Sequence, residues 1–301
     1  MDPGVEVLIA EDEPVSQRLL MRTLESWGYK VILAHDGAEA WRLLQAPEAP
    51  GLAIIDWEMP GLDGTEVCRR LKAHVDKRHT YVIMLTSRDA ASDIVTAMDA
   101  GADDFVEKPF RSEELRVRLR AGHRIVEMQA ELRRKASHDD LTGIFNRRIV
   151  LEMLGRELHR AVRDHKPLAV ALLDLDHFKR VNDTYGHQAG DLVLREAAVR
   201  ISSSIRASDV AGRYGGEEFL IVMPRCDEET SLRVAERVRA VIGGTPVLAA
   251  DQAIDATVSI GVAATAAAAT TTPKALIGQA DAALYRAKEA GRNRVELNRA
   301  D

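Results

Sequence analysis

Short apolar runs alternate with amphipathic segments along the first 110 residues. Runs typical of buried strands occur at Val5–Ala10, Leu52–Ile55 and Tyr81–Leu85. Between them lie segments such as Val15–Trp27, where leucines recur at helical spacing. Because strands that alternate with helices form βαβ units, this pattern predicts an α/β fold: a doubly wound, flavodoxin-like parallel sheet with helices on both faces.

Residues 111–137 contain no proline and are rich in good helix formers. The spacing of their apolar residues predicts one long helix, with Gly122 as its weak point. This apolar stripe is too regular for a solvated linker and is compatible with a dimeric coiled coil. The apolar positions are Leu115, Leu119, Ile125, Val126, Met128 and Leu132.

A different pattern begins near residue 138. Strand patterns occur at Leu168–Leu175, Val210–Tyr214, Phe219–Met223 and Thr257–Val262, and helical patterns at His187–Ile205, Leu232–Ile242 and Ala275–Ala290. Gly215 and Gly216 separate two of these strands and indicate a hairpin. Two β-α-β halves around a central hairpin predict a ferredoxin-like α+β domain of the kind found in polymerase palms.

Two further expectations concern the second half of the chain. The helix at His187–Ile205 is expected to turn its apolar residues inward, and Ala263–Thr272, which is low in complexity, is expected to be an exposed loop. The inward residues are Leu192, Leu194, Ala198 and Ile201. The whole pattern predicts a domain over residues 1–120, a helical linker over 121–137 and a second domain over 138–301.

Composition narrows the class of protein. A length of 301 residues suits two domains, and 46% hydrophobic with 29% charged residues is the mix of globular proteins. A net charge of -6 argues against DNA binding through phosphate neutralisation. Cys68 and Cys226 are expected to be reduced thiols. Neither a signal peptide nor a membrane-spanning run is apparent, so we expect a cytoplasmic protein without a membrane partner.

Chemically active residues follow the predicted parallel strands. Glu11 and Asp12 follow the run Val5–Ala10, Asp56 follows Leu52–Ile55 and Thr86 follows Tyr81–Leu85. Lys108 stands where a further parallel strand would end. Ligands bind at the carboxyl edge of such sheets, and three crowded carboxylates suit Mg²⁺. With that ion present, the Asp56 carboxylate is a candidate phosphoryl acceptor, Lys108 can neutralise the product and the Thr86 hydroxyl can turn toward it.

These residues lie in the motifs EDEP, IIDWEMPGLDG, LTS and KPF, and residues 5–120 resemble a response-regulator receiver domain. The resemblance implies that one Mg²⁺ is bound by Glu11, Asp12 and Asp56 with the Glu58 carbonyl. Asp56 would accept a phosphoryl group from a cognate histidine kinase. Thr86 and Phe105 would form the switch pair.

A second constellation lies in DLDHFKRVNDTYGHQAGD (174–191) and RYGGEEF (213–219). Asp174 ends one strand and Glu217 follows the hairpin turn on a neighbouring strand, so the two carboxylates can form a metal site for a nucleoside triphosphate. Gly215 and Gly216 leave room for a phosphate or base at the backbone. Asp and Asn side chains suit the donors of guanine. Lys288 and Arg292, four apart on a predicted helix, can face one triphosphate.

Residues 137–299, which include the motif DDLTGIFNRR (139–148), resemble a GGDEF diguanylate cyclase domain. The resemblance implies that two GTP condense to cyclic di-GMP and two pyrophosphates. Because each domain would carry one GTP, the reaction needs a homodimer or a higher homo-oligomer. The implied ligands of two Mg²⁺ are Asp174, the Leu175 carbonyl and Glu217, with Glu217 also a candidate base. The other implied site residues are Lys179 for charge on the phosphates, Phe178, Asn182, His187 and Asp191 for the guanine nucleoside, and Lys288 and Arg292 for phosphates.

A third motif, Arg206-Ala-Ser-Asp209, stands shortly before the GGEEF sequence. In the same family an RxxD motif in this position is a product-inhibition site. Arg237 matches a family arginine that contacts the bound product from elsewhere in the dimer. An arginine fork suits the O6 and N7 atoms of guanine. The motif therefore implies feedback inhibition by cyclic di-GMP.

Three other functions are open to the same sequence. A catalytically weak GGDEF module would sense GTP or cyclic di-GMP without turnover, although every catalytic position that can be matched is intact. A transcription factor would need a DNA-binding motif after residue 137, and none is visible. A cyclic di-GMP phosphodiesterase would need a further domain, for which no segment is left unassigned.

Overall fold

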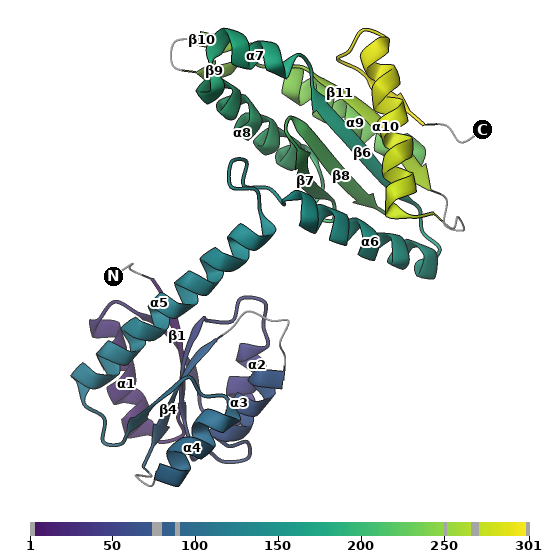
Figure 1. The fold of residues 1–301 in the computed structure, drawn as a ribbon. Coiled ribbons are helices and arrows are strands. Elements are labelled where there is room, and N and C mark those ends of the chain that lie inside the picture. The colour runs from purple at the N-terminus through teal and green to yellow at the C-terminus, as the bar shows by residue number, and fades with distance from the viewer. Residues whose placement is uncertain (1–3, 74–79, 88–90, 250–251, 266–270, 299–301) are drawn as a thin grey trace. The chain divides into compact units, whose positions relative to one another are not determined.

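The computed structural model describes residues 4–73, 80–87, 91–249, 252–265 and 271–298. The chain separates into two compact units, residues 1–132 and residues 133–301, which are drawn in Figure 1 and described one at a time. No helix within the described ranges combines the length and the apolar character that a membrane crossing requires.

The first unit contains a five-stranded parallel sheet in the order β2-β1-β3-β4-β5. This strand order is that of flavodoxin-like folds, so the predicted fold class is confirmed. The strands are β1 (Glu6–Ala10), β2 (Lys30–Ala34), β3 (Leu52–Asp56), β4 (Tyr81–Thr86) and β5 (Asp104–Glu107), and the helices are α1 (Pro14–Ser26), α2 (Gly37–Leu44), α3 (Gly64–Ala73), α4 (Ala91–Ala100) and α5 (Ser112–Ser137).

Two apolar clusters cover the two faces of this sheet. Leucines of α1 and α5 pack with one set of alternating strand residues, and α2, α3 and α4 pack on the other set. Every residue of β3 is buried, as expected for a central strand with helices on both faces. The carboxyl edge of the strands therefore stays open for a site.

Helix α5 has the predicted length and continues through Gly122 without a break. A β-carbon at Gly122 would lie 2.4 Å from Cδ1 of Tyr81 at the start of β4, so the missing side chain lets the helix seat on that ring. Beyond this contact, Ile125, Met128 and Leu132 are exposed by 39%, 56% and 62%. An exposed apolar stripe at this spacing agrees with the coiled-coil expectation.

The second unit contains a five-stranded mixed sheet in the order β12-β11-β6-β8-β7, and β9 and β10 form a separate antiparallel pair. All neighbours in the larger sheet are antiparallel except β11 and β12. The strands are β6 (Leu168–Leu175), β7 (Val210–Gly215), β8 (Glu218–Pro224), β9 (Val247–Ala249), β10 (Gln252–Ile254), β11 (Val258–Thr265) and β12 (Val295–Leu297).

Helices cover both faces of the larger sheet, as Figure 1 shows. Side chains of α6 and α10 form the core on one face, and those of α7, α8 and α9 form the core on the other. These helices are α6 (Arg147–Asp164), α7 (Phe178–Tyr185), α8 (His187–Ser204), α9 (Glu228–Gly243) and α10 (Pro273–Glu289). The central strand β6 carries Asp174 to the edge of a fully packed core.

Two expectations about this unit were wrong. Leu192 is 37% exposed, because the buried stripe of α8 runs through Val193, Leu194 and Ala197. The loop expected at Ala263–Thr272 begins later, since β11 continues to Thr265 opposite Leu168. The rest of that prediction falls partly on residues 266–270, which lie outside the described residues.

Candidate active site and phospho-acceptor site

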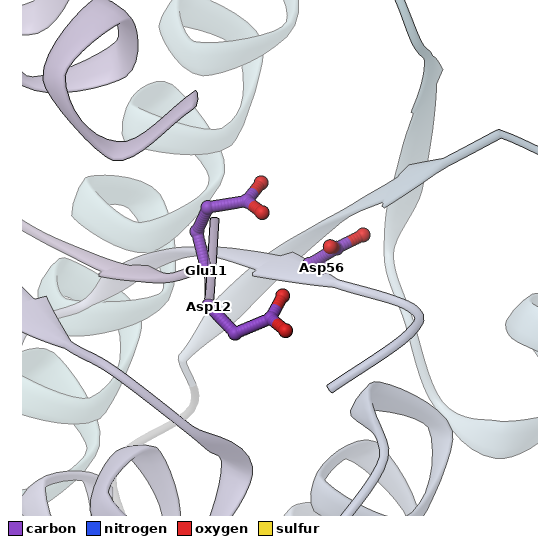
Figure 2. A group of neighbouring side chains, drawn as sticks. All are labelled: Glu11, Asp12 and Asp56. Carbon is purple, nitrogen blue, oxygen red and sulfur yellow. The ribbon is translucent and has the colours of Figure 1, made fainter. Parts of the chain in front are cut away.

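The acidic residues predicted at the parallel sheet edge meet in the structure (Figure 2). Glu11, Asp12 and Asp56 each offer a carboxylate oxygen within 4.8 Å of the others. The Lys108 Nζ atom lies 2.7 Å from Glu11 Oε2 and 2.8 Å from Asp56 Oδ2. Residues at the ends of three strands thus converge because parallel strands end at one edge.

Charge at this site is unbalanced toward the negative. Burial raises the pKa of Glu11, and the neighbouring Asp56 raises it further, while the hydrogen bond from Lys108 opposes the shift. Burial alone would lower the pKa of Lys108, but hydrogen bonds to Asp56 and Glu11 raise it above its ordinary value. One lysine facing three carboxylates leaves a hard-oxygen donor set that fits Mg²⁺. The Glu58 carbonyl stays a prediction.

Thr86 and Phe105 lie on one face of the sheet. Thr86 is the buried last residue of β4, and Phe105 is the register partner of Met84, two residues before Thr86. Side chains two residues apart on a strand share a face. The Arg118 guanidinium lies 5.5 Å from the centroid of the half-buried Phe105 ring and pairs with Asp104. The ring is therefore held at a surface rather than sealed in the core.

The second acidic group is arranged by strand register. Asp174 near the end of β6 is the register partner of Glu218 on β8, and the Leu175 N–H donates to the Glu217 carbonyl at 3.3 Å. The Lys288 Nζ atom lies 2.8 Å from Asp174 Oδ2. Glu217 belongs to the turn, so Glu218 rather than Glu217 stands directly opposite Asp174. Sequence reasoning missed Glu218, although the second glutamate of GGEEF was visible.

Electrostatics link these carboxylates. Burial raises the pKa of Glu218, and the charge of Asp174 raises it further. Carboxylates beside a carbonyl are a donor set that fits Mg²⁺. Within the described ranges, however, Glu11, Asp12 and Asp56 form the only group of three acidic, histidine or cysteine residues whose ligand atoms lie within 4.8 Å. The acids of the second unit are more openly spaced.

Helices α7 and α8 bring the predicted guanine-binding residues together. Gly186, with a φ of 83°, joins the two helices, so Asn182 on α7 lies against the first turn of α8. A β-carbon at Gly190 would lie 1.9 Å from Asn182 Oδ1, and the next residue is Asp191. Gly190 thus lets the Asn182 amide lie against α8 at the residue before Asp191.

The remaining predicted nucleotide residues differ in exposure. Phe178 is 8% exposed and belongs to the apolar core, where it supports α7 from beneath. Lys179 and His187 are exposed. Arg292 is not on a helix with Lys288, because α10 ends at Glu289. Gly291 and Arg292 are left-handed, so the helical four-residue spacing does not apply to this pair.

The loop over residues 138–146, called the connecting loop below, is hydrogen-bonded to the hairpin that carries the GGEEF sequence. Arg213 Nη1 lies 3.1 and 3.2 Å from the two carboxylate oxygens of Asp139. The same guanidinium donates through Nε to the Gly216 carbonyl at 2.9 Å. Gly216 has a φ of 49° and directly precedes Glu217. The connecting loop therefore contacts the turn that presents Glu217, a contact that sequence reasoning missed.

The RxxD motif forms a closed turn between α8 and β7. The Arg206 N–H donates to Asp209 Oδ2 at 3.0 Å, and the Asp209 N–H donates to the Arg206 carbonyl at 2.9 Å. Arg237 on α9 donates to the Ser204 carbonyl at 2.8 Å, so it lies beside this turn in the same unit. Arg206 lines two hollows of about 290 and 530 Å³.

Comparison with known proteins shows a family match for each half of the chain. The family model "Diguanylate cyclase, GGDEF domain" matches residues 136–294, and "Response regulator receiver domain" matches residues 7–120. The chain belongs to the GGDEF diguanylate cyclase family and joins that domain to a response-regulator receiver domain.

Particular relatives share one or both halves. The response regulator PleD of Caulobacter vibrioides is 34% identical over 97% of this chain, which spans 65% of the length of PleD. The diguanylate cyclase DosC of Escherichia coli is 41% identical over 55% of this chain and 36% of its own length. The coiled coil and GGDEF domain of DgcB from Caulobacter crescentus, solved with c-di-GMP, matches 62% of this chain and all of that structure, with 33% identity and a TM-score of 0.55.

Proposed function

We propose that this chain is a diguanylate cyclase that condenses two GTP into cyclic di-GMP and two pyrophosphates, under the control of phosphorylation at Asp56. The observation that carries the proposal is the cluster of Asp174, Glu217, Glu218 and Lys288 at one sheet edge of a GGDEF-family domain. This cluster combines carboxylates for metal-bound phosphates with a lysine for phosphate charge, as nucleotidyl transfer requires.

The chemistry follows from these groups. The 3′-hydroxyl of one GTP attacks the α-phosphorus of the other, an O–P bond forms and the bond to pyrophosphate breaks. The same attack in the opposite direction closes the ring and releases the second pyrophosphate. Glu217 takes the proton of the attacking hydroxyl. Asp174, the Leu175 carbonyl and Glu217 would hold Mg²⁺, which when bound reduces the negative charge that the attacking oxygen meets. Lys179, Lys288 and Arg292 bind the phosphates in this scheme.

Guanine selection rests on α7 and α8. The Asp191 carboxylate accepts hydrogen bonds from the ring N–H and the exocyclic amine of guanine, and the Asn182 amide adds a further contact. Adenine does not offer that pair of donors on the same edge. His187 completes the nucleoside side of the proposed site, and Phe178 supports it from the core beneath α7.

Control comes from the receiver domain. In this proposal residues 1–120 accept the phosphoryl group from a histidine kinase, residues 121–137 transmit the change, and residues 138–301 carry out the cyclisation. The Asp56 carboxylate attacks the phosphorus of the kinase's phosphohistidine, an O–P bond forms, and the P–N bond to the histidine breaks. Glu11 and Asp12 would hold Mg²⁺, which would reduce the charge repulsion in this transfer, and Lys108 pairs with the product charge. The exposed apolar stripe of α5 suits pairing with a second copy, and two copies are needed to bring two GTP together. A cytoplasmic location, where GTP is available, belongs to the same proposal.

Product feedback is the last part of the proposal. Arg206 and Asp209 offer a donor fork and an acceptor to the guanine edges of cyclic di-GMP. Arg237 of the second copy would contact the same product molecule. Product bound there would favour a dimer in which the two GTP molecules do not meet, provided that it binds that state better.

The central experiment incubates the full chain with GTP and Mg²⁺ and separates the products by chromatography. We expect cyclic di-GMP and pyrophosphate, with more product after addition of a small phosphodonor or a beryllium fluoride mimic. Asp56→Ala should keep the unstimulated rate and lose the stimulation. GTP binding without any product would instead favour a nucleotide sensor. Stimulation that survives in Asp56→Ala would refute the receiver assignment.

A progress curve tests the feedback site separately. Arg206→Ala should let product accumulate further than in the wild type, with a similar initial rate at low product. The same inhibition by added cyclic di-GMP in both proteins would exclude Arg206. A joint loss of stability and initial rate would show that Arg206 only braces the turn.

A further inference from the structure

Asp176 is a buried carboxylate that is not among the proposed metal ligands or substrate contacts. It follows β6 by one residue, is 8% exposed and accepts hydrogen bonds from three directions. Its Oδ1 accepts from Ser259 Oγ at 2.6 Å. Its Oδ2 accepts from Thr257 Oγ at 2.7 Å and from the Asn293 backbone N–H at 3.0 Å. One carboxylate therefore joins the end of β6, the start of β11 and the loop after α10.

Asn293 is held from a second side. Arg239 on α9 donates through Nη1 to Asn293 Oδ1 at 2.8 Å, and its guanidinium is itself fixed by Glu236. Arg292 and Asn293 have φ values of 61° and 46°. Two successive left-handed residues other than glycine persist only where the surrounding structure holds them, and such strain gathers at functional sites. Asp176, Asn293 and Arg239 are called the loop clamp below.

The loop clamp sets the place of Arg292. The Arg292 N–H donates to the Ala287 carbonyl at 3.0 Å, so the loop folds back onto the last turn of α10 beside Lys288. The Lys288 ammonium is the group that lies 2.8 Å from Asp174. The Arg292 side chain is exposed, and its guanidinium makes no hydrogen bond or ion pair with any residue that the structure describes. The loop therefore holds an unpaired cation next to the acidic site.

We propose that Asp176, assisted by Arg239, is a positioning residue for the triphosphate of GTP. It acts through the Asn293 N–H: by fixing the left-handed turn, it fixes the guanidinium of Arg292 relative to Asp174 and Lys288. The inference rests on the proposed function, because it takes a nucleoside triphosphate as the ligand. An arginine held in advance binds phosphate better than one that must be ordered on binding.

Asp176→Asn tests the proposal with little change in volume. The amide can turn its NH₂ group toward the Ser259 hydroxyl, which also accepts, and keep its oxygen on the Asn293 N–H. The charge-assisted hydrogen bonds to the carboxylate then become weaker neutral ones, so the turn loses part of its support. In the full chain with Mg²⁺, the Kd of a GTP analogue with an α,β-methylene bridge should rise about 10-fold, as expected for a lost hydrogen bond to a charged group. The Kd of guanosine should not change, because guanosine has no phosphate.

A double-mutant cycle separates positioning from general stability. If Asp176 acts through Arg292, Asp176→Asn should raise the Kd of the analogue by less than about 2-fold in a protein that already carries Arg292→Ala. The reason is that the effects of coupled residues are not additive. If Asp176→Asn raises the Kd of the analogue equally with Arg292 and with alanine at position 292, the inference is overturned. A guanosine Kd that rises as much as that of the analogue would also overturn it.

Two further variants keep the test decisive if Asp176→Asn folds poorly. Arg239→Gln removes the guanidinium that holds the Asn293 side chain. It should also raise the Kd of the analogue, and this effect should again depend on the presence of Arg292. Ser259→Ala is the matched control, because it removes the bond to Oδ1 and leaves Oδ2 facing Asn293. Its analogue Kd should stay within about 2-fold of wild type. A wild type that binds neither ligand would overturn the proposed function together with this inference, whereas additive effects in a GTP-binding wild type overturn the inference alone.

Discussion

Each compact unit contains a lysine that pairs with an aspartate of its candidate site at the same distance. Lys108 lies 2.8 Å from Asp56, and Lys288 lies 2.8 Å from Asp174. The surroundings differ: Lys108 also pairs with Glu11, whose side chain is fully buried, whereas Lys288 is 33% exposed and contacts one carboxylate. The same ion pair thus neutralises a crowded buried site in one unit and an open site in the other.

Strand topology explains this difference. In the parallel sheet, the ends of β1 and β3 lie side by side at one edge, so their acids crowd together and cannot turn away. In the antiparallel pair of β6 and β8, Asp174 and Glu218 are opposite each other, while Glu217 lies in the connecting turn. A crowded site suits one small phosphoryl group, and an open site leaves room for a nucleotide.

The largest expected effect is the difference in stability between variants of the two lysines. Lys108→Met should lower the free energy of unfolding of the receiver unit by roughly 3 kcal/mol, because Glu11 and Asp56 stay buried without their cation. Lys288→Met should cost less than about 1 kcal/mol, since its ion pair is partly exposed. Chemical denaturation of the full chain with a chelator present measures both. Mg²⁺ should reduce the loss in Lys108→Met, and equal losses in the two variants would contradict the comparison.

The next effect concerns the two glutamates of the open site. Glu217→Gln should reduce turnover by roughly 10²-fold or more, since it removes a metal-binding charge and a base. Glu218→Gln is the matched variant, because it changes the residue that stands opposite Asp174. Steady-state rates with GTP decide between them. Near-normal turnover in Glu217→Gln with a large loss in Glu218→Gln would move the catalytic role to Glu218.

A smaller effect is expected on base selection. Asp191→Ser should reduce the preference for GTP over ATP by about 1–3 kcal/mol, the value of one good polar contact to a base. Gly190→Ala should weaken the binding of GTP for a different reason, because its β-carbon would displace the Asn182 amide. Competition between the two nucleotides gives the measurement. A wild type that makes a mixed product efficiently from GTP and ATP would refute the role of Asp191.

The smallest effect compares a glycine from each unit. Gly122→Ala should destabilise the receiver unit by about 1–2 kcal/mol, because the new methyl group would overlap the Tyr81 ring. Gly155→Ala on α6 should stabilise the second unit by up to about 1 kcal/mol, because open space surrounds that position and alanine favours a helix. Thermal unfolding of both variants checks the signs. Stabilisation by both would mean that Gly122 makes no tight contact.

Local sequence patterns predicted the first unit well. The apolar runs of β1, β3 and β4 and the leucine spacing of α5 are properties of short segments, so they could be recognised without a partner. The same holds for Glu11, Asp56 and Lys108: each follows its strand directly, and parallel strands bring such residues to one edge. Family resemblance added roles to residues that the pattern had already placed.

Contacts between distant segments could not be predicted in this way. Which glutamate faces Asp174 depends on the register of β6 and β8, and GGEEF alone does not specify it. The four-residue spacing of Lys288 and Arg292 predicted that both lie on one helix. In the structure α10 ends at Glu289, and Arg292 lies in the left-handed turn that follows. Asp176 lies 117 positions before the backbone N–H of Asn293, so no local pattern indicates their hydrogen bond.

The sequence by itself determined the element order, the fold class of both halves and the chemical groups available at each site, because these follow from periodicity and from the motifs. Tertiary structure alone decided that Gly122 seats α5 on Tyr81, that Arg213 contacts both Asp139 and the Gly216 carbonyl, and that Asp176 supports the Arg292 turn. Steric fit and long-range hydrogen bonds depend on which segments become neighbours, and only the packed chain determines that.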